Sequence, residues 1–174
     1  MLFRKFKLIN KSDTDITDMY VTMWNDPDLG DAADDFSGCD TLLSMTFVYN
    51  ANPIDQIYGS QPAAAGFDFF QGPIVDGEPT DTAIFNGQYV VGKKNLPMTA
   101  HYFYINPDAV YRDPTQGQYQ GTQEWYNFMQ GRVGTTGDIF PDPTTGGTTV
   151  FALYGDPVAG TGWLDGLQHP PGDR

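Results

Sequence analysis

The pattern of apolar and polar positions along the chain predicts a succession of short β-strands. Residues 2–10 alternate apolar side chains with lysines, and residues 16–24 contain a second apolar run. Residues 41–50 (TLLSMTFVYN) are apolar enough to lie in the interior of a sheet. Further strands are expected at residues 67–70, 98–105 and 148–154.

Turn-forming residues separate these runs and support the same fold class. The dipeptide Asn86-Gly87 favours left-handed backbone conformations and predicts a hairpin within residues 83–91. The chain has 20 Gly and 13 Pro, and 14% of its residues are aromatic, which is typical of many short strands joined by turns. We therefore expect one mainly β domain covering residues 1–174. Its expected form is an antiparallel, jelly-roll-like β-sandwich with long loops rich in Gly, Pro and Asp.

One segment, residues 122–133, has helical spacing instead. Its apolar positions include Trp125 and Phe128, and Thr122 is a candidate N-terminal cap. Gly131 would end the helix or weaken it. We therefore expect at most one short helix, near residues 122–131.

Net charge disfavours several classes of partner. The formal charge is −13, from 22 acidic and 9 basic residues. Nucleic acids and anionic membrane surfaces are bound through Lys and Arg, so neither is an expected partner. No apolar stretch is long enough to span a bilayer, so membrane insertion is not expected either. All the acids except Glu78 and Glu124 are Asp, which favours turns and caps over helix surfaces.

The most distinctive chemistry lies in residues 24–41 (WNDPDLGDAADDFSGCDT), which carry six aspartates and no Lys, Arg or Glu. Strands are expected on both sides of this segment, so a loop of like charges held between them needs a cation or must extend into solvent. Ca²⁺ takes about six to eight oxygen ligands, and aspartates in loops with a glycine commonly supply them. The expected site comprises Asp26, Asp28, Gly30, Asp31, Asp34, Asp35 and Asp40.

The segment differs from an EF-hand, the best-known calcium loop. An EF-hand has a bidentate Glu at its twelfth position, whereas counting from Asp26 gives Ser37, and Pro27 is also foreign to that loop. Mg²⁺ fits less well than Ca²⁺, because it keeps its waters and needs few carboxylates. The competing interpretation is a solvated loop whose aspartates cap backbone amides.

No catalytic constellation stands out, so we expect a protein that is not an enzyme. His101 is interpreted as a sheet residue with its hydrogen bonds satisfied, and His169 as an exposed residue of the Pro-rich tail. Their spacing does not suit a zinc site. Cys39, the single cysteine, stands next to Asp40, an anionic setting that raises a thiol pKa and argues against a nucleophile.

A glycan-binding module, or part of a polysaccharide-degrading enzyme, is the alternative function. Exposed aromatic side chains stack on sugar rings, although most aromatic residues are core or rim residues. A glycosidase also needs two carboxylates about 5–9.5 Å apart, and sequence does not give that distance. The candidate sugar-binding residues are Tyr58, Trp125, Tyr126 and Trp163.

Several sequence blocks carry a family resemblance: W-N-D-P-D-L-G-D-A-A-D-D-F-S-G-C-D-T, F-V-Y-N, G-F-D-F-F-Q-G-P-I, K-N-L-P-M-T, F-Y-I-N, the segment Trp125-Tyr126-Asn127 and D-P-V-A-G-T-G-W-L-D-G. With these blocks the chain, from Phe3 to Arg174, resembles a recurrent region of large, mostly uncharacterised secreted or surface proteins. Those proteins come from Bacteroidota-like bacteria and often end in a type IX secretion sorting domain.

The resemblance implies an extracellular or cell-surface location and supplies no catalytic residues. It also implies that the chain is a fragment of a longer protein. Neighbouring domains of that parent protein would then be its partners, together with glycans or other surface proteins. Taken with the acidic segment, the sequence predicts a non-enzymatic, Ca²⁺-stabilised β-domain with a structural or adhesion role.

Overall fold

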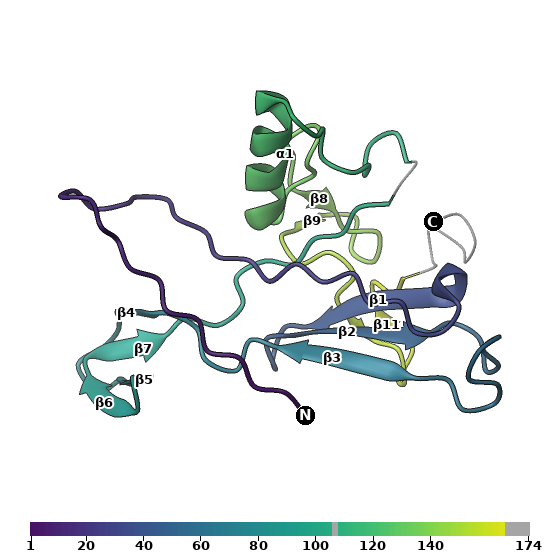
Figure 1. Cartoon of the computed structure of the whole chain (residues 1–174), viewed down its shortest axis with the longest axis horizontal. Helices are drawn as coiled ribbons and strands as arrows, with labels where there is room; N and C mark the ends of the chain where they lie inside the picture. Colours follow the sequence, from purple (N-terminus) through teal and green to yellow (C-terminus); the bar gives the residue numbers. More distant parts are fainter. Residues whose placement is uncertain (106–107, 166–174) are drawn as a thin grey trace.

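The largest sheet of the molecule has three antiparallel strands in the order β1-β2-β3 (Figure 1). The computed structural model describes residues 1–105 and 108–165. In the register of this sheet, Asp35 lies opposite Asn50, and Met45 lies opposite Asp68. The strands are β1 (Asp35–Asp40), β2 (Met45–Asn50) and β3 (Ala64–Asp68).

Four two-stranded antiparallel sheets accompany it in the described part of the chain. They pair β4 with β7, β5 with β6, β8 with β9 and β10 with β11. Their bounds are β4 (Ile74–Asp76), β5 (Thr82–Phe85), β6 (Gln88–Val91), β7 (Lys93–Asn95), β8 (Phe140–Pro141), β9 (Thr148–Thr149), β10 (Gly155–Asp156) and β11 (Thr161–Gly162). The mainly β, antiparallel character of the chain is confirmed. The jelly-roll-like sandwich stays a prediction, because these sheets are small and separate.

The hairpin predicted from Asn86-Gly87 is formed by β5 and β6. Phe85 lies opposite Gln88, so the dipeptide is the whole connection. Asn86 and Gly87 have φ angles of 50° and 76°. Positive φ at both central residues defines the tight turn whose twist matches that of paired strands. The strong local preference of the dipeptide was therefore sufficient to predict this element.

The predicted short helix is present as α1 (Tyr119–Met129). It begins three residues before the predicted start, with Gln118 at its N-terminal cap, so Thr122 lies inside the helix and does not cap it. Gly131 follows the C-terminal cap with φ of +69°, and its N–H donates to the Phe128 carbonyl at 2.8 Å. A left-handed glycine just after the last turn is a common helix terminator, as the sequence predicted.

The first part of the chain is extended but joins no sheet. Residues 2–10 and 16–24 are almost entirely exposed and contain no strand, so the two strands predicted there are wrong. No backbone–backbone hydrogen bond joins either stretch to the rest of the described chain. Alternating side chains describe a strand only when a second backbone pairs with it, and here no such backbone lies alongside.

The acidic segment also differs from its predicted form, because its second half is strand β1. Asp35–Asp40 pairs along β2, and a tight turn at residues 41–44 connects the two strands. The expectation of one acidic loop between two strands is therefore wrong. The sequence DFSGCD has an aspartate at each end and no apolar alternation, so its pattern does not predict a strand.

Two other predicted strands are only partly formed. Within residues 98–105, His101 makes one isolated bridge with Phe151. Within residues 148–154, β9 covers only Thr148–Thr149. The His101 N–H donates to the Val150 carbonyl at 3.0 Å, so these two segments do lie side by side. The length over which they pair is too short to form a sheet.

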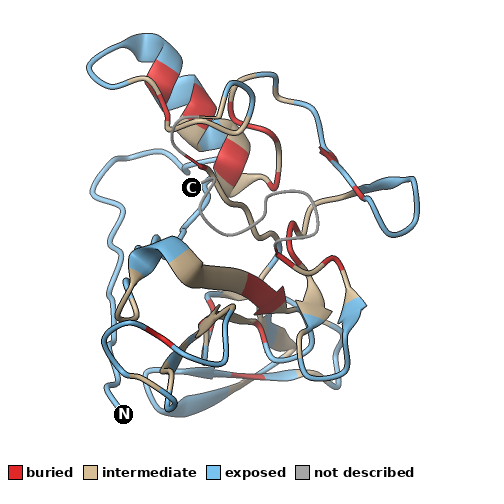
Figure 2. Ribbon diagram, turned by 90° about the vertical axis from the view of Figure 1, so that its right-hand side faces the viewer, coloured by how far each residue is buried: buried red, intermediate tan, exposed pale blue. Residues whose placement is uncertain are grey.

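Aromatic side chains dominate the core, which lies between α1 and residues 133–163. Figure 2 shows the buried positions of α1 along one side of the helix. Tyr102 stacks on Phe128, with ring centroids 5.1 Å apart, and Phe103 stacks on Phe140 at 5.7 Å. The buried members of the cluster are Phe128, Val133, Phe140, Ala152, Leu153 and Trp163.

This core is joined to the main sheet along one edge of β1. The Cys39 N–H donates to the Leu153 carbonyl at 3.1 Å, and Cys39 forms a parallel bridge with Tyr154. The Ser37 N–H donates to Asp165 Oδ2 at 2.7 Å. These contacts therefore cover the outer edge of β1. They also hold in place the second half of the acidic segment, which forms this strand.

Asp142, a buried carboxylate of the β8–β9 hairpin, makes stability depend on pH. Its Oδ1 accepts from the Thr144 N–H at 2.9 Å and the Thr144 hydroxyl at 2.8 Å, and its Oδ2 accepts from the Tyr154 hydroxyl at 2.8 Å. Burial alone would raise the pKa of Asp142, but these hydrogen bonds outweigh burial and lower the pKa to about 2.

We expect Asp142→Asn to lower the free energy of unfolding by about 2 kcal/mol at neutral pH. A lowered pKa in the folded protein gives stability that is complete above the ordinary value of 3.8 and is lost as pH falls toward about 2. The variant and the parent protein should therefore converge in urea titrations at about pH 2. An equal deficit at both pH values would contradict the assignment, and Asp156→Asn, at the exposed end of β10, is the control.

Candidate metal centre

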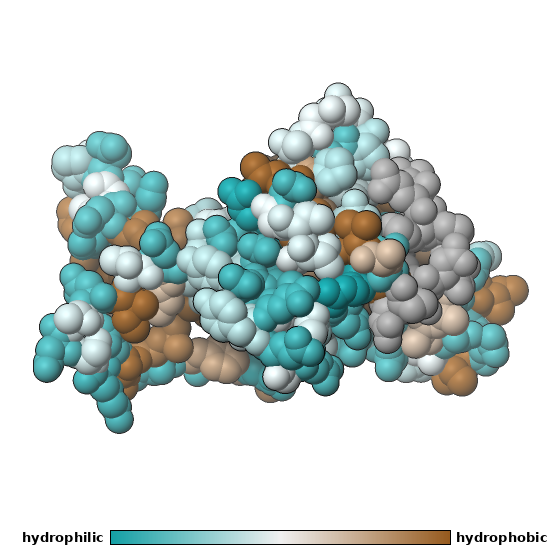
Figure 3. Space-filling view, turned by 90° about the horizontal axis from the view of Figure 1, so that it is seen from above, coloured by the Kyte–Doolittle hydropathy of each residue, from teal (hydrophilic) through white to brown (hydrophobic). Residues whose placement is uncertain are grey.

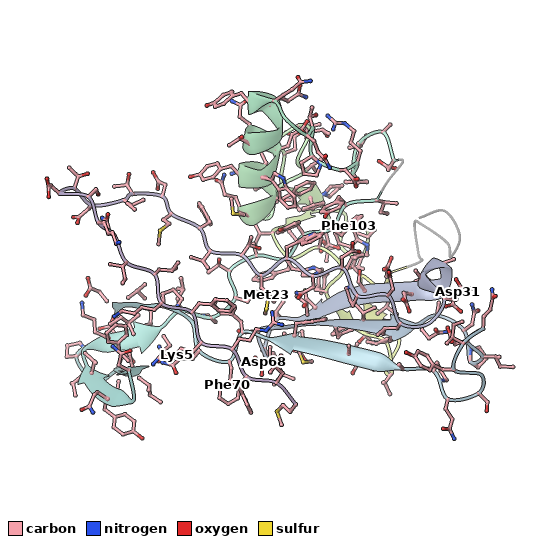
Figure 4. The ribbon with its side chains drawn as sticks, in the orientation of Figure 1. Lys5, Met23, Asp31, Asp68, Phe70 and Phe103 are labelled. Atoms are coloured by element: carbon pink, nitrogen blue, oxygen red, sulfur yellow. The ribbon has the colours of Figure 1, made fainter. Side chains whose placement is uncertain are left out.

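The acidic segment folds back on the first residue of β1. A 3₁₀ turn, η1 (Ala32–Asp34), begins where Asp31 Oδ1 accepts from the Ala33 N–H at 3.1 Å. The Leu29 N–H donates to Asp35 Oδ2 at 2.7 Å, which closes the loop around η1. Figure 4 shows Asp31 at this end of the sheet.

The turn that follows β2 packs against the same loop through Asp55, which is 1% exposed. Asp55 Oδ2 accepts from the Asp31 N–H at 2.9 Å, and Oδ1 accepts from the N–H groups of Ile57 at 2.7 Å and Tyr58 at 2.5 Å. Donation from the Asp31 and Tyr58 backbone lowers the pKa of Asp55 and keeps it ionised. Asp55 therefore ties residues 30–31 to the end of β2.

Side-chain oxygens at this junction lack hydrogen-bond donors. Asp34 Oδ2 accepts from the side-chain amides of Asn50 and Asn52, each at 3.0 Å. Asp34 Oδ1 and Asn50 Oδ1 are also buried, yet no group in the described part of the chain donates to either. A buried acceptor without a donor costs about 1–3 kcal/mol, and a cation is one group that would satisfy both oxygens.

The electrostatics of the junction point the same way. Burial raises the pKa of Asp35, and the carboxylates of Asp34, Asp28 and Asp55 raise it further, against an opposing hydrogen bond from Leu29. The other three carboxylates are therefore close enough to disfavour the charge of Asp35. A divalent cation among them would relieve that repulsion.

The predicted ligands are only partly brought together. Asp28, Asp34 and Asp35 are close enough to interact electrostatically, and Asp31 lies on the same loop. Asp26 instead lies near Tyr104, whose pKa is raised by burial and also by the Asp26 charge. Asp40 is at the opposite end of β1.

Asp40 has a structural role at its own end of the strand. Its Oδ1 accepts from the backbone N–H groups of Leu42 at 2.8 Å and Leu43 at 2.9 Å, and so caps the β1–β2 turn. A strand of six residues is about 20 Å long, so Asp40 is too far from Asp34 to share an ion with it. The solvated-cap interpretation is correct for this aspartate.

Sequence reasoning missed the residues that come from the turn after β2. The amides of Asn50 and Asn52 and the carboxylate of Asp55 complete the cluster, and Gln56 donates to Asp31 at 2.5 Å. The stretch N-A-N-P-I-D-Q directly follows an apolar strand, which was the available signal. That signal can be interpreted only once β1 is known, because β1 pairs Asp35 with Asn50, and the sequence pattern predicts a loop there.

The donor set is suited to a hard cation. Among the described residues no three His, Cys, Asp or Glu side chains are arranged as a metal-binding group. The residues present nevertheless fit Ca²⁺ in type, because the two buried oxygens without donors, on Asp34 and Asn50, are carboxylate and amide oxygens. Asp34, Asn50, Asp35 and Asp28 would hold the ion.

Gly30 controls how closely the loop approaches Asp55, and we expect Gly30→Ala to destabilise the protein by about 2–3 kcal/mol. Its φ is +87°, and a Cβ atom there would lie 2.5 Å from Asp55 Oδ1. Gly59→Ala is the matched control, because Gly59 has φ of +65° with open space around it. Chemical denaturation should show a larger loss for Gly30→Ala, and equal losses would mean that backbone strain alone is responsible.

His101 and Cys39, the two described residues weighed above for catalytic roles, have structural roles instead. His101 Nδ1 lies 2.6 Å from the Ala152 carbonyl, and burial lowers the pKa of His101, as expected of a satisfied sheet residue. Cys39 is buried, and burial raises the pKa of its thiol to about 12. His169 lies outside the described residues.

The four candidate sugar-binding aromatics do not form one surface. Trp163 is 2% exposed and belongs to the core, where it meets Phe103 edge to face at 6.1 Å. Trp125 is half-buried against Phe128, whereas Tyr58 and Tyr126 are exposed. Tyr126 donates to the Asp18 carbonyl at 2.9 Å.

Two wider observations complete the description. Among the described residues, no helix has the length and apolar character needed to cross a membrane. Neither the protein-family models, nor the curated proteins, nor the solved structures with which the chain was compared contain a match to it.

Proposed function

We propose that the chain is a non-enzymatic β-domain of a secreted or cell-surface protein, and that Ca²⁺ bound at the start of β1 stabilises it. The observation that carries this proposal is the pair of buried oxygens, Asp34 Oδ1 and Asn50 Oδ1, that accept no hydrogen bond from the described residues. They lie where β1 and β2 begin their pairing, next to Asp35, whose pKa the carboxylate of Asp28 helps to raise.

The ion would act as a structural clamp. Asp34 and Asn50 belong to η1 and β2, so a shared cation would join the acidic loop to the main sheet. Extracellular Ca²⁺ modules bind with dissociation constants of about 10⁻⁴–10⁻³ M. Millimolar Ca²⁺ would then add about 1–2 kcal/mol to the free energy of unfolding.

An extracellular setting fits this affinity, because millimolar Ca²⁺ is found there, and it is also what the family resemblance implies. In the same proposal, the domain works within a longer parent protein and contacts neighbouring domains. The jelly-roll-like sandwich expected from the sequence would then be completed by strands that pair with the open edges of the small sheets.

We expect Asp34→Asn to abolish the heat of Ca²⁺ binding in isothermal titration calorimetry. The substitution removes one of the two oxygens without donors and one charge of the cluster, so the metal-free variant should be as stable as the parent protein or more stable. Asp40→Asn is the matched control from the same acidic segment and should bind Ca²⁺ normally. Normal binding by Asp34→Asn, or loss of binding in Asp40→Asn, would contradict the assigned site.

A glycan-binding role is a second proposal, supported by a shallow hollow beside α1. Trp125 and Tyr119 line it together with Gln116, Gln118 and Thr122. Aromatic faces with amide and hydroxyl groups around them are suited to sugar rings. Affinity electrophoresis in polysaccharide gels tests this role: retardation that Tyr119→Ala removes would support it, and unretarded migration of the parent protein in every gel would reject it.

A further inference from the structure

Residues 2–24, the N-terminal arm, expose large apolar side chains and pair with no strand of the described sheets. In Figure 1 the arm leaves the sheets, turns at its far end and returns toward β1. Figure 3 shows apolar surface on the part of the molecule that holds the arm and the β4–β7 sheet. The exposed side chains of its first stretch are Leu2, Phe3, Phe6, Leu8 and Ile9, at 61–76%.

The free edge of the main sheet belongs to β3. β1 is covered on its outer side by Leu153, whereas β3 pairs only with β2 in the described part of the chain. The Phe69 N–H donates to the Ser44 carbonyl at 3.0 Å, which fixes the alternation of the ladder. The odd-numbered residues of β3 therefore exchange backbone hydrogen bonds with β2. The backbone N–H and C=O groups of Ala64, Gly66 and Asp68 point away from β2, toward the free edge.

The arm and this edge match in pattern. Residues 2–9 place Leu2, Phe6 and Leu8 on one face and two lysines on the other. In β3, the half-buried side of the strand carries Ala65 and Phe67, and the exposed side carries Asp68. A strand added with its apolar face beside Phe67 would bring its lysines to the side of Asp68.

Charge also separates the first stretch of the arm from the rest of the chain. Residues 1–11 contain four of the nine basic residues and no acidic one, so the net charge of −13 is the sum of +4 there and −17 elsewhere. Two acidic bodies repel each other, and the basic residues 1–11 of each copy would offset that repulsion. The four residues are Arg4, Lys5, Lys7 and Lys11.

Residues 2–9, the first stretch of the arm, are poorly engaged by their own chain. Phe3 meets Phe70 edge to face at 6.0 Å, beyond the end of β3, and no backbone hydrogen bond joins residues 2–9 to the described sheets. Figure 4 shows Lys5 in the same region as Asp68 and Phe70. Residues 25–30, with Pro27 and a left-handed Gly30, connect the arm to η1 and β1.

We propose that residues 2–9 of one copy add as a strand to the free edge of β3 in a second copy, and that two copies exchange arms reciprocally. The exchange is closed by a two-fold axis, so both free edges are paired and both arms are covered. Backbone hydrogen bonds to Ala64, Gly66 and Asp68 give affinity, and the two faces of the arm set its orientation. The inference does not rest on Ca²⁺ binding.

Sedimentation velocity of the full chain, from micromolar to millimolar concentration, tests this exchange. The mass should rise from 19.2 kDa to twice that value. Phe6→Asp in the arm and Gly66→Pro at the edge should each weaken dimerisation at least about tenfold. Tyr89→Asp is the matched control, because Tyr89 is 79% exposed on β6, and it should dimerise normally. A monomeric parent protein, or a dimer unaffected by Phe6→Asp, would overturn the proposal.

Disulfide trapping identifies the edge and keeps the test valid if Gly66→Pro fails to fold. The only native cysteine, Cys39, is buried. Proteins carrying Lys5→Cys and Asp68→Cys separately should form a mixed disulfide dimer when they are combined and oxidised. The double variant should likewise form linked dimers. A disulfide within single chains of the double variant would show that the arm pairs with its own β3 and would overturn the exchange, as would the absence of any link.

Discussion

Trp163→Ala should lower the free energy of unfolding by about 3–5 kcal/mol, the largest effect expected from a single substitution in this chain. Trp163 is 2% exposed and meets the rings of Phe103 and Phe140 at 6.1 and 6.3 Å. Truncation would leave a cavity at the centre of the aromatic cluster, and the rigid rings around it cannot collapse to fill it. Urea denaturation at neutral pH measures the loss.

Tyr58→Ala is the matched control among the aromatics that the sequence nominated for sugar binding. Tyr58 is 51% exposed, so its truncation should change stability by less than about 0.5 kcal/mol. If Trp163→Ala unfolded like the parent protein and only polysaccharide retention were lost, Trp163 would be a binding residue and its core assignment would be wrong.

Glu124→Ala should cost about 3 kcal/mol, the second largest effect. Glu124 is 3% exposed. Its Oε1 accepts from Arg112 at 2.6 Å and from Gln120 at 2.9 Å, and its Oε2 accepts from the Thr115 N–H at 2.6 Å. Burial would raise the pKa of Glu124, but these partners outweigh burial and lower it. Removing the carboxylate leaves the Arg112 charge and a backbone N–H without their partner.

The exposed ion pair between Lys93 and Asp76 provides the comparison. Both are at the surface, with side chains 40% and 91% exposed, so Asp76→Ala should cost much less stability than Glu124→Ala. Equal losses for Glu124→Ala and Asp76→Ala in the same denaturation series would contradict the view that Glu124 anchors residues 112–118 to α1.

Elements encoded by local preference were predictable from the sequence. The Asn86-Gly87 turn and the end of α1 at Gly131 depend on backbone conformations that those residues favour wherever they stand. The start of α1 was missed because no side chain marks it. Gln118 makes no side-chain capping hydrogen bond. Position 121 requires a glycine, because a Cβ atom there would lie 1.7 Å from the Thr115 carbonyl oxygen.

Elements that depend on distant partners were not predictable. Residues 2–10 have a strand pattern as good as that of β2, but pairing is a property of two segments, and the sequence shows only one at a time. The candidate metal centre illustrates the same limit. Composition nominated Asp28, Asp34 and Asp35, which the fold places within electrostatic reach of one another around Asp35, whereas the position of Asn50 beside them follows from the β1–β2 register alone.

The most direct test of Ca²⁺ stabilisation is a thermal melt of the chelator-stripped protein, with and without millimolar Ca²⁺ and with Mg²⁺ as the comparison. A cation that binds Asp34 and Asn50 only in the folded state should raise Tm by about 2–8 °C. Mg²⁺ should raise it less, because it gives up its waters reluctantly. No shift, or equal shifts with both ions, would contradict a calcium site at the start of β1.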